Sequence, residues 1–286
     1  MSLSFRVAIV RHYAFNSPAP PKFAILISSL VLAPLFPRYA HVVIISLTPA
    51  SCSRLPDACS FEQAALAEPL SVLLHAARRA DLTPSSNATV LVFGVGAIGL
   101  LACALSKSYG AKRVVAVDIN PTRLNFALEN GFAEQVYCLP MGEKAKTTDD
   151  QIRRAKENIS AALTEFNMPD GFDIVFECTG AEPCIQMSIF AAVTGGKVML
   201  VGMGSRNVTL PLSAAALREV DIHGSFRYAH TYPTALKLLA EGKLPNIEKI
   251  ITHRFELKDT ARAFELLSRG RDDDGNMVLK VMVGSH

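Results

Sequence analysis

The chain has 286 residues, of which 50% are hydrophobic and 19% charged, and its mean hydropathy is +0.25. This composition excludes a disordered chain, and 17 glycines without a period exclude a collagen-like one. The net charge of +3 comes from the N-terminus. Residues 1–50 hold four bases and no acid, so 29 minus 4 leaves 25 bases against 26 acids in the rest. No basic stripe marks a nucleic-acid partner.

The six cysteines include no Cys-x-x-Cys pair. Several lie inside apolar segments, where a free cysteine behaves as a small core residue. A disulfide framework is not expected in a chain of this size, so a reducing compartment, the cytoplasm, is the predicted location.

The first fifty residues form an acid-free segment unrelated to the rest of the chain, with an apolar run at Phe23–Phe36. The run is short and interrupted by proline, which disfavours a transmembrane helix, so no membrane partner is expected. Three interpretations stay open: a signal peptide, a transit peptide, or an altered exon or error in the inferred gene.

From Thr89 onward, short β-branched runs alternate with helical patterns. The predicted strands are Thr89–Phe93, Arg113–Val117, Glu134–Cys138, Ile174–Glu177, Lys197–Val201 and Asp221–Phe226. The predicted helices are Ile98–Tyr109, Pro121–Asn130, Asp149–Phe166, Pro183–Val193 and Ala214–Glu219. Asn120 before Pro121 is expected to cap its helix. The alternation predicts an α/β fold with a doubly wound parallel six-stranded sheet.

After Phe226 the alternation changes. The expected elements are a helix at Tyr232–Glu241, a strand at Ile250–Arg254, a helix at Thr260–Arg269 and a strand at Met277–Val283. The predicted domains are an N-terminal segment (1–50), a lobe remnant with a linker (51–80), a dinucleotide-binding domain (81–228) and a return to the second lobe (229–286).

The sequence Gly94-Val-Gly96-Ala-Ile-Gly99 comes directly after the first predicted strand and opens a helix. Gly94 permits a tight turn, Gly96 lets the backbone approach a pyrophosphate, and Gly99 permits close helix–strand packing. The helix N-terminus then offers N–H groups to phosphates. This context makes a dinucleotide site the preferred interpretation.

Asp118 ends the next predicted strand and can accept hydrogen bonds from ribose hydroxyls, whereas it would repel a 2′-phosphate. NAD is therefore favoured over NADP. The alternative is that Asp118 only starts a turn and caps the helix at Pro121. Two later strand ends, Cys178-Thr179-Gly180 and Gly202-Met203-Gly204, carry small residues against which a flat ring could lie.

Five motifs surround this fingerprint in order: Glu68-Pro-Leu-Ser-Val72, Glu177-Cys-Thr-Gly-Ala-Glu182, Arg218-Glu-Val-Asp-Ile222, Phe226-Arg-Tyr228 and Ile251-Thr-His-Arg-Phe255. From about Thr48 to the C-terminus, the chain resembles the zinc-dependent sorbitol, xylitol and arabinitol dehydrogenases of the medium-chain dehydrogenase/reductase superfamily. The resemblance implies a Rossmann domain, an incomplete GroES-like second lobe, NAD, zinc, a polyol substrate and a homo-oligomer.

The resemblance also implies residue roles. Cofactor contacts would come from Gly94, Gly96, Ala97, Ile98, Gly99, Asp118, Arg123, Thr179, Gly180, Val201, Gly202, Met203, Ser225, Phe226 and Arg227. Arg227 and Tyr228 would reach the polyol, and Glu68 would lie at the catalytic zinc. Without the resemblance, Glu68 favours a helix N-terminus, Arg227 a surface ion pair and Tyr228 the core. His75, His223 and His253 are interpreted as structural.

A catalytic zinc needs about three protein ligands. The Cys and Gly-His-Glu segment that supply them in the family are absent from this sequence, which leaves Glu68 as the surviving candidate. The expected function is NAD-dependent oxidation of a sugar alcohol to a ketose, impaired by the missing ligands. The alternative is a non-catalytic NAD-binding partner of full-length homologues. The identity of the polyol stays open.

Overall fold

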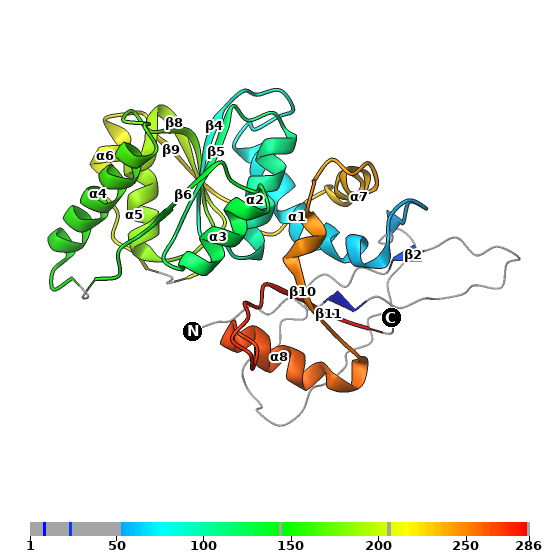
Figure 1. Cartoon of the computed structure of the whole chain (residues 1–286). Helices are drawn as coiled ribbons and strands as arrows, with labels where there is room; N and C mark the ends of the chain where they lie inside the picture. Colours follow the sequence, from blue (N-terminus) through cyan, green and yellow to red (C-terminus); the bar gives the residue numbers. More distant parts are fainter. Residues whose placement is uncertain (1–7, 10–22, 25–52, 143–144, 205–206, 285–286) are drawn as a thin grey trace, which may run out of the picture. The chain divides into compact units, whose positions relative to one another are not determined.

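The computed structural model describes residues 8–9, 23–24, 53–142, 145–204 and 207–284. The chain divides into two compact units, one of residues 72–229 and one of residues 1–71 with 230–286 (Figure 1). Apart from the two-residue strands β1 (Ala8–Ile9) and β2 (Phe23–Ala24), the interpretations of the first fifty residues lie outside the described residues. The four predicted domain boundaries stay predictions.

A six-stranded parallel sheet forms the centre of the unit 72–229. In spatial order its strands are β6 (Gln135–Cys138), β5 (Arg113–Asp118), β4 (Thr89–Phe93), β7 (Phe172–Glu177), β8 (Ala192–Leu200) and β9 (Asp221–Gly224). Along the chain, β4 is the first strand of this sheet, and β5 and β6 follow on one side of it. The chain then crosses to the other side of β4, where β7, β8 and β9 lie in order. This order confirms the doubly wound α/β fold, with the strand order reversing between β4 and β7.

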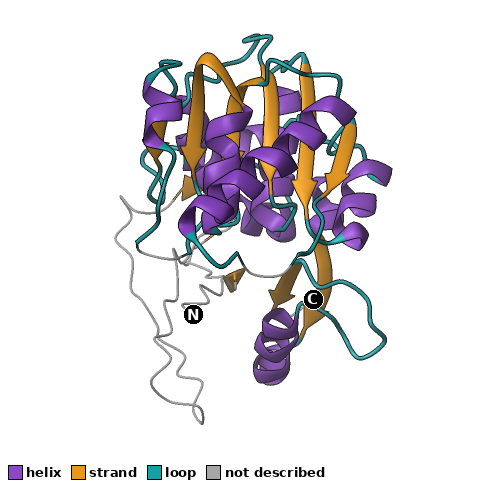
Figure 2. Cartoon of the chain, turned by 90° about the vertical axis from the view of Figure 1, so that its left-hand side faces the viewer, coloured by secondary structure: helices purple, strands orange, loops and turns teal. Residues whose placement is uncertain are grey.

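The strands are apolar on both faces because helices cover both (Figure 2). One row of side chains runs across four neighbouring strands through Val115, Leu91, Val175 and Val198, as the register requires. All four belong to one buried cluster. Successive side chains of a strand point to opposite faces, so Val90 and its neighbours serve the other face.

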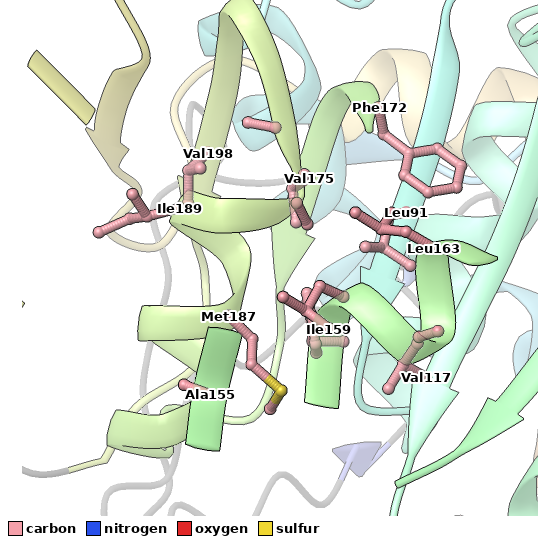
Figure 3. Packing of buried hydrophobic residues seen from close by; sticks show 14 of the residues in the cluster. Leu91, Val117, Ala155, Ile159, Leu163, Phe172, Val175, Met187, Ile189 and Val198 are labelled. Atoms are coloured by element: carbon pink, nitrogen blue, oxygen red, sulfur yellow. The ribbon is translucent and has the colours of Figure 1, made fainter. Parts of the chain in front are cut away.

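The helices of this unit are α2 (Ala97–Ser108), α3 (Pro121–Glu129), α4 (Thr148–Glu165), α5 (Glu182–Ala191) and α6 (Leu212–Ala216). The α4 and α5 residues Ile159, Leu163 and Met187 pack over the row through Leu91 (Figure 3). Phe166 lies at the end of α4 and makes edge-on ring contacts with two other aromatic residues of this cluster. The helices α2 and α3 contact β4, β5 and β6.

The predicted elements match the observed ones, with shifted ends. The largest shift is in β8, which begins at Ala192 instead of Lys197, because Ala192 already pairs with Phe172 of β7 before an irregularity that ends where Lys197 pairs with Ile174. Asn120 caps α3 as predicted, since its side chain accepts the N–H groups of Thr122 and Arg123. Gly131 takes a left-handed conformation just after this helix.

A long helix, α1 (Phe61–Arg79), was not predicted. It contains Pro69 in its interior, which removes one backbone donor. A reciprocal capping box starts it: Gln63 N donates to Ser60 Oγ at 3.1 Å, and Ser60 N donates to Gln63 Oε1 at 2.9 Å. The interpretation of Glu68 as marking a helix N-terminus is therefore wrong, because the helix begins at Phe61.

The unit of residues 1–71 and 230–286 contains the predicted C-terminal elements. They are α7 (Tyr232–Ala240), β10 (Ile251–Phe255), α8 (Thr260–Arg269) and β11 (Lys280–Val283). The 3-10 turns η2 (Ile247–Ile250) and η3 (Leu257–Asp259) and the strand β3 (Ser53–Arg54), which pairs with β2, were not predicted. β11 pairs in parallel with both β1 and β10. A small cluster of Ala263, Leu266, Val281 and neighbours joins α8 to this sheet. Within the described residues, no helix is both long and apolar enough to cross a bilayer.

Candidate functional site

The candidate site lies at the carboxyl edge of the six-stranded sheet. The final row of paired residues runs through Val117, Phe93, Glu177, Leu200 and Gly224. The loops that come after these residues therefore leave the sheet along one edge. In open α/β sheets, ligands bind beyond this edge where the strand order reverses, here between β4 and β7.

The glycine loop behaves as its three positions require. Gly94 has φ of +85°, and its N–H donates to Val117 O at 2.7 Å. A Cβ on Gly99 would overlap the carbonyl oxygen of Gly94, so helix α2 packs against the strand end at backbone distance. A Cβ on Gly96 would meet nothing within 4 Å, which leaves open space beside the backbone at that point.

The N-terminus of α2 has donors to offer. Its N-cap is Gly96, which has no side chain to accept the first-turn N–H groups. Those groups, including the ones of Ala97 and Ile98, have no acceptor within the helix. A pyrophosphate placed in the open space would supply the acceptor and match the positive end of the helix dipole.

Asp118 lies at the end of β5 and is 8% exposed. Its Oδ2 accepts the N–H of Val95 at 2.8 Å, and its Oδ1 accepts the N–H of Asn120 at 2.9 Å. The alternative interpretation of Asp118 is half right: its carboxylate starts a turn by accepting the N–H of Asn120, but the cap of the following helix is Asn120. Asp118 instead ties the glycine loop to β5 and keeps lone pairs on both oxygens for a ribose diol.

Arg123, in the first turn of α3, shows a second feature that fits a ligand. Its Nε atom is buried without a partner among the described residues. Ile119 comes after Asp118 and is 55% exposed although it is large and apolar. A heteroaromatic ring beside these two residues would cover the apolar side chain and offer an acceptor to the guanidinium.

The loops after β7 and β8 meet backbone to backbone. A Cβ on Gly202 would overlap the N atom of Gly180, and one on Gly204 would overlap its carbonyl oxygen. A Cβ on Gly94 would come within 2.6 Å of Thr179 Cγ2, so the glycine loop also contacts this pair. These glycines create a flat backbone surface near Val201, Gly202 and Met203, and the side chain of Met203 is 60% exposed.

The segment from Ser225 to Ala229 is held by two arginines at the end of α1. Arg79 Nε donates to Gly224 O at 2.8 Å, and Arg78 Nη2 donates to Ala229 O at 3.1 Å. Between these anchors Arg227 has φ of +53°, and its guanidinium lies 5.4 Å from the centre of the exposed Phe226 ring. Tyr228 is half-buried, and the Oγ atom of Ser225 is buried without a partner among the described residues.

Burial sets the pKa values near this edge. Desolvation raises the pKa of Glu177, and hydrogen bonds from Thr179 and Gly180 oppose that rise. Burial also raises the pKa of Cys184 to about 11 and that of Cys178 well above its usual value. Burial therefore favours the protonated, less nucleophilic form of both thiols at neutral pH.

The predicted zinc position is not supported by the grouping of residues. Among the described residues, no three His, Cys, Asp or Glu side chains group closely enough to hold a metal ion. Glu68 is 8% exposed in the middle of α1 and belongs to the unit of residues 1–71 and 230–286. The described residues therefore do not fit a catalytic zinc, and no chemical step is assigned to one.

Two contributions were not predicted. Glu177 ends β7 beneath the loop that carries Thr179, and the signal available was an acid at the end of a buried strand, as for Asp118. Arg78 and Arg79 anchor the segment after β9, and no local pattern in the sequence pairs them with it. The cofactor-site residues that were predicted in 72–229 lie at the carboxyl edge, Asp118 as the last residue of β5 and the others on loops or in first helical turns.

Comparison with known proteins places these features in a family. Residues 97–241, just over half of the 286, match the family model described as zinc-binding dehydrogenase. The chain belongs to the zinc-binding dehydrogenase family.

Sorbitol dehydrogenases are among its relatives. The chain is 42% identical over 221 residues to sorbitol dehydrogenase of Homo sapiens and 41% identical to that of Gallus gallus. Each alignment covers 77% of this chain and 57% of the relative, so the chain spans a little over half the length of these curated relatives. The resemblance to the polyol dehydrogenases is therefore confirmed.

Solved structures agree on the fold. The crystal structure of 2R,3R-butanediol dehydrogenase from Bacillus subtilis matches with a TM-score of 0.65 at 26% identity, over 82% of this chain and 61% of that one. The alcohol dehydrogenase TADH from Thermus sp. ATN1 matches with a TM-score of 0.67 at 24% identity, over the same shares of the two chains, and supports the fold alone.

Proposed function

We propose that this chain binds NAD along the carboxyl edge of its six-stranded sheet. The observation that carries the proposal is Asp118, a nearly buried carboxylate that closes the glycine loop and keeps acceptor sites for a ribose diol. The same charge disfavours NADP, because a 2′-phosphate would lie against it.

In this proposal each loop has one task. Gly94, Gly96, Ala97, Ile98 and Gly99 bind the pyrophosphate through backbone N–H groups, and Arg123 lies beside the adenine. Thr179 and Gly180 with Val201, Gly202 and Met203 form the surface for the nicotinamide and its carboxamide. Ser225, Phe226 and Arg227 border the cofactor, and Arg227 and Tyr228 face the polyol.

The chemistry we propose for the complete site is oxidation of a secondary alcohol of a sugar alcohol to a ketose. When bound, NAD supplies the hydride acceptor at C4 of the nicotinamide. The hydroxyl proton is released to solvent, so the substrate loses a hydride and a proton, which are two electrons and two hydrogens, and becomes the ketose. The residues of this chain orient the cofactor, and the guanidinium of Arg227 and the hydroxyl of Tyr228 position the polyol.

We further propose that polyol turnover by this chain is impaired. Alcohol oxidation in the family depends on zinc, which lowers the pKa of the alcohol. Glu68 is one carboxylate, and the described residues contain no group of three metal-ligating side chains. With no such group among the described residues, we expect the cofactor loops to bind NAD without efficient hydride transfer.

A second candidate function is a non-catalytic NAD-binding partner of full-length homologues. The lack of a metal-ligating group among the described residues favours this candidate. So does the open edge of β9, which pairs only with β8 among the described strands. For both candidates we propose a cytoplasmic location, which the free cysteines of the described residues support. We also propose that the chain assembles into homo-oligomers.

Calorimetric titration of the purified chain with NAD and NADP tests the cofactor proposal. NAD binding at least about tenfold tighter than NADP binding is expected, which corresponds to about 1.4 kcal/mol. Equal affinities, or no binding of either, would refute it. A second assay measures NADH formation from sorbitol or xylitol with and without added Zn²⁺. Rapid, zinc-dependent formation of NADH would refute the proposal that polyol turnover is impaired. Co-purification with a full-length homologue identifies the second candidate.

A further inference from the structure

Glu177 is a completely buried carboxylate at the carboxyl end of β7. The strand β7 lies at the centre of the sheet, and Glu177 pairs with Phe93 of β4 on one side and with Leu200 of β8 on the other. Burying a carboxylate is costly unless hydrogen bonds satisfy it. The partners of this side chain therefore indicate what the position requires.

The hydrogen bonds of this side chain go to one loop. Oε1 accepts the N–H of Thr179 at 2.8 Å and also the hydroxyl of Thr179. The N–H of Gly180 lies 2.9 Å from Oε2 and 3.1 Å from Oε1. The carboxylate therefore holds two consecutive residues of the loop by both backbone and side chain.

The main chain of the same residue holds the neighbouring loop. Glu177 O accepts the N–H of Val201 at 2.9 Å and the N–H of Gly202 at 2.8 Å. One residue thus connects the loop after β7 with the loop after β8. These are the two loops that form the proposed nicotinamide surface.

The two loops are packed too closely to move independently. A Cβ on Gly202 would lie 2.7 Å from the N and C atoms of Thr179, and one on Gly180 would lie 2.8 Å from Met203 N. A displacement of Thr179 and Gly180 is therefore transmitted to the adjoining loop through backbone contact.

The other end of the dinucleotide site rests on different groups. The glycine loop is held by the hydrogen bond to Asp118 and by its packing on α2, and it meets the loop after β7 only through packing of Gly94 on the Thr179 methyl group and the adjoining backbone, with no hydrogen bond from Glu177 among the described residues. A change at Glu177 should therefore act on one end of the cofactor more than on the other.

We propose that Glu177 is a positioning residue that sets the shape of the nicotinamide end of the cofactor site by joining the 178–180 and 201–204 loops. This role rests on the proposed NAD binding. The positioning role requires the ionised carboxylate, whose two oxygens accept hydrogen bonds and donate none. Replacement by the amide would place an NH₂ group against the N–H of Gly180 or of Thr179.

The test compares two ligands on the full chain: NADH, and ADP-ribose, which lacks the nicotinamide. For Glu177→Gln we expect the Kd of NADH to rise about tenfold, as for one lost charged hydrogen bond, and that of ADP-ribose to change less than about twofold. The matched control is Asp173→Asn. Asp173 lies on the same strand and accepts from Thr89 at the opposite edge, so its substitution should leave the ratio of the two Kd values unchanged.

The outcomes separate the two proposals. If the wild-type chain binds neither ligand, the NAD-binding proposal fails and this one with it. If the wild-type chain binds both and Glu177→Gln weakens both equally, or neither, the positioning role alone is refuted. If Glu177→Gln does not fold, Thr179→Val decides, since it removes the hydroxyl that donates to Glu177 and accepts from the N–H of Ala181, whereas Thr179→Ser keeps both bonds. The role would then be refuted if the ratio of the NADH Kd to the ADP-ribose Kd is no higher for Thr179→Val than for Thr179→Ser.

Discussion

Two glycines of one motif should respond to the same substitution in different ways. Gly96 and Gly99 belong to the same glycine motif, Gly96 as the N-cap of α2 and Gly99 in its first turn, yet their surroundings differ. A Cβ on Gly99 would overlap Gly94 O, lie 2.9 Å from Gly94 C and lie 3.3 Å from Val92 Cγ1. A Cβ on Gly96 would meet nothing within 4 Å. Gly99→Ala therefore tests packing, and Gly96→Ala tests access of a ligand.

The magnitude for Gly99→Ala results from two opposing effects. Forcing a methyl group against backbone atoms costs about 3 kcal/mol, at the upper end of overpacking because a carbonyl cannot rotate away. Replacing glycine by alanine inside a helix returns about 1 kcal/mol. The net loss in the free energy of unfolding is about 2 kcal/mol, or about 4–8 °C in Tm for a unit of this size.

Gly96→Ala should cost about 1 kcal/mol or less, because alanine is a poorer N-cap than glycine. Its effect should fall on binding, since the methyl group occupies the space proposed for the pyrophosphate. We expect the Kd of NAD to rise at least about tenfold. Gly99→Ala should weaken NAD binding as well, because the helix N-terminus must move.

Thermal unfolding followed by circular dichroism and NADH titration followed by fluorescence provide the two measurements. A Gly99→Ala variant with unchanged Tm would show that α2 does not depend on backbone contact with Gly94. A Gly96→Ala variant that binds NADH like the wild type would show that the open space is not the pyrophosphate site. Either result would refute the assignment of roles within the motif.

Three further predictions concern single side chains. Asp118→Asn should weaken NAD about tenfold and narrow the preference over NADP, as calorimetry would show, and an unchanged preference would contradict the assigned role. Phe166→Ala should lower the free energy of unfolding, measured by urea denaturation, by about 3–5 kcal/mol, because the ring is fully buried. Burial raises the pKa of Glu177 above its ordinary value of 4.5, so the folded state binds the proton more tightly. The stability of the wild type relative to Glu177→Gln should therefore fall as the pH rises above 4.5, and a flat difference would contradict this.

Local patterns in the sequence predicted most of the nucleotide-binding unit. Alternating β-branched runs and helical periods identified the six strands, because each element shows its burial through its own periodicity. Asn120 and Pro121 marked a helix start for the same reason: a cap needs only neighbouring residues. The Gly94–Gly99 motif was interpretable because strand, turn and helix are consecutive in the chain.

The misses have physical causes as well. The helix α1 carried a usable signal in its Ser60 and Gln63 capping box, and it contains Pro69, a residue that local rules place at a helix start and not in its interior. Tertiary burial of the alanines and leucines around it offsets the missing donor, and a local rule does not register that. The early start of β8 reflects pairing with β7, which is a contact between segments separated in the chain.

The sequence by itself determined the class of fold, the glycine loop, the acid at Asp118 and the family, because these depend on order and spacing along the chain. Only the tertiary structure decided that Asp118 closes the glycine loop, that two arginines of α1 hold the 225–229 segment, and that Glu177 joins two loops. The arginine bonds depend on how the end of α1 packs on the segment after β9, whereas the bonds of Asp118 to the glycine loop and of Glu177 O to the 201–202 loop depend on how neighbouring strands align at one edge of the sheet. That alignment arises when the sheet forms, and neither segment encodes it alone.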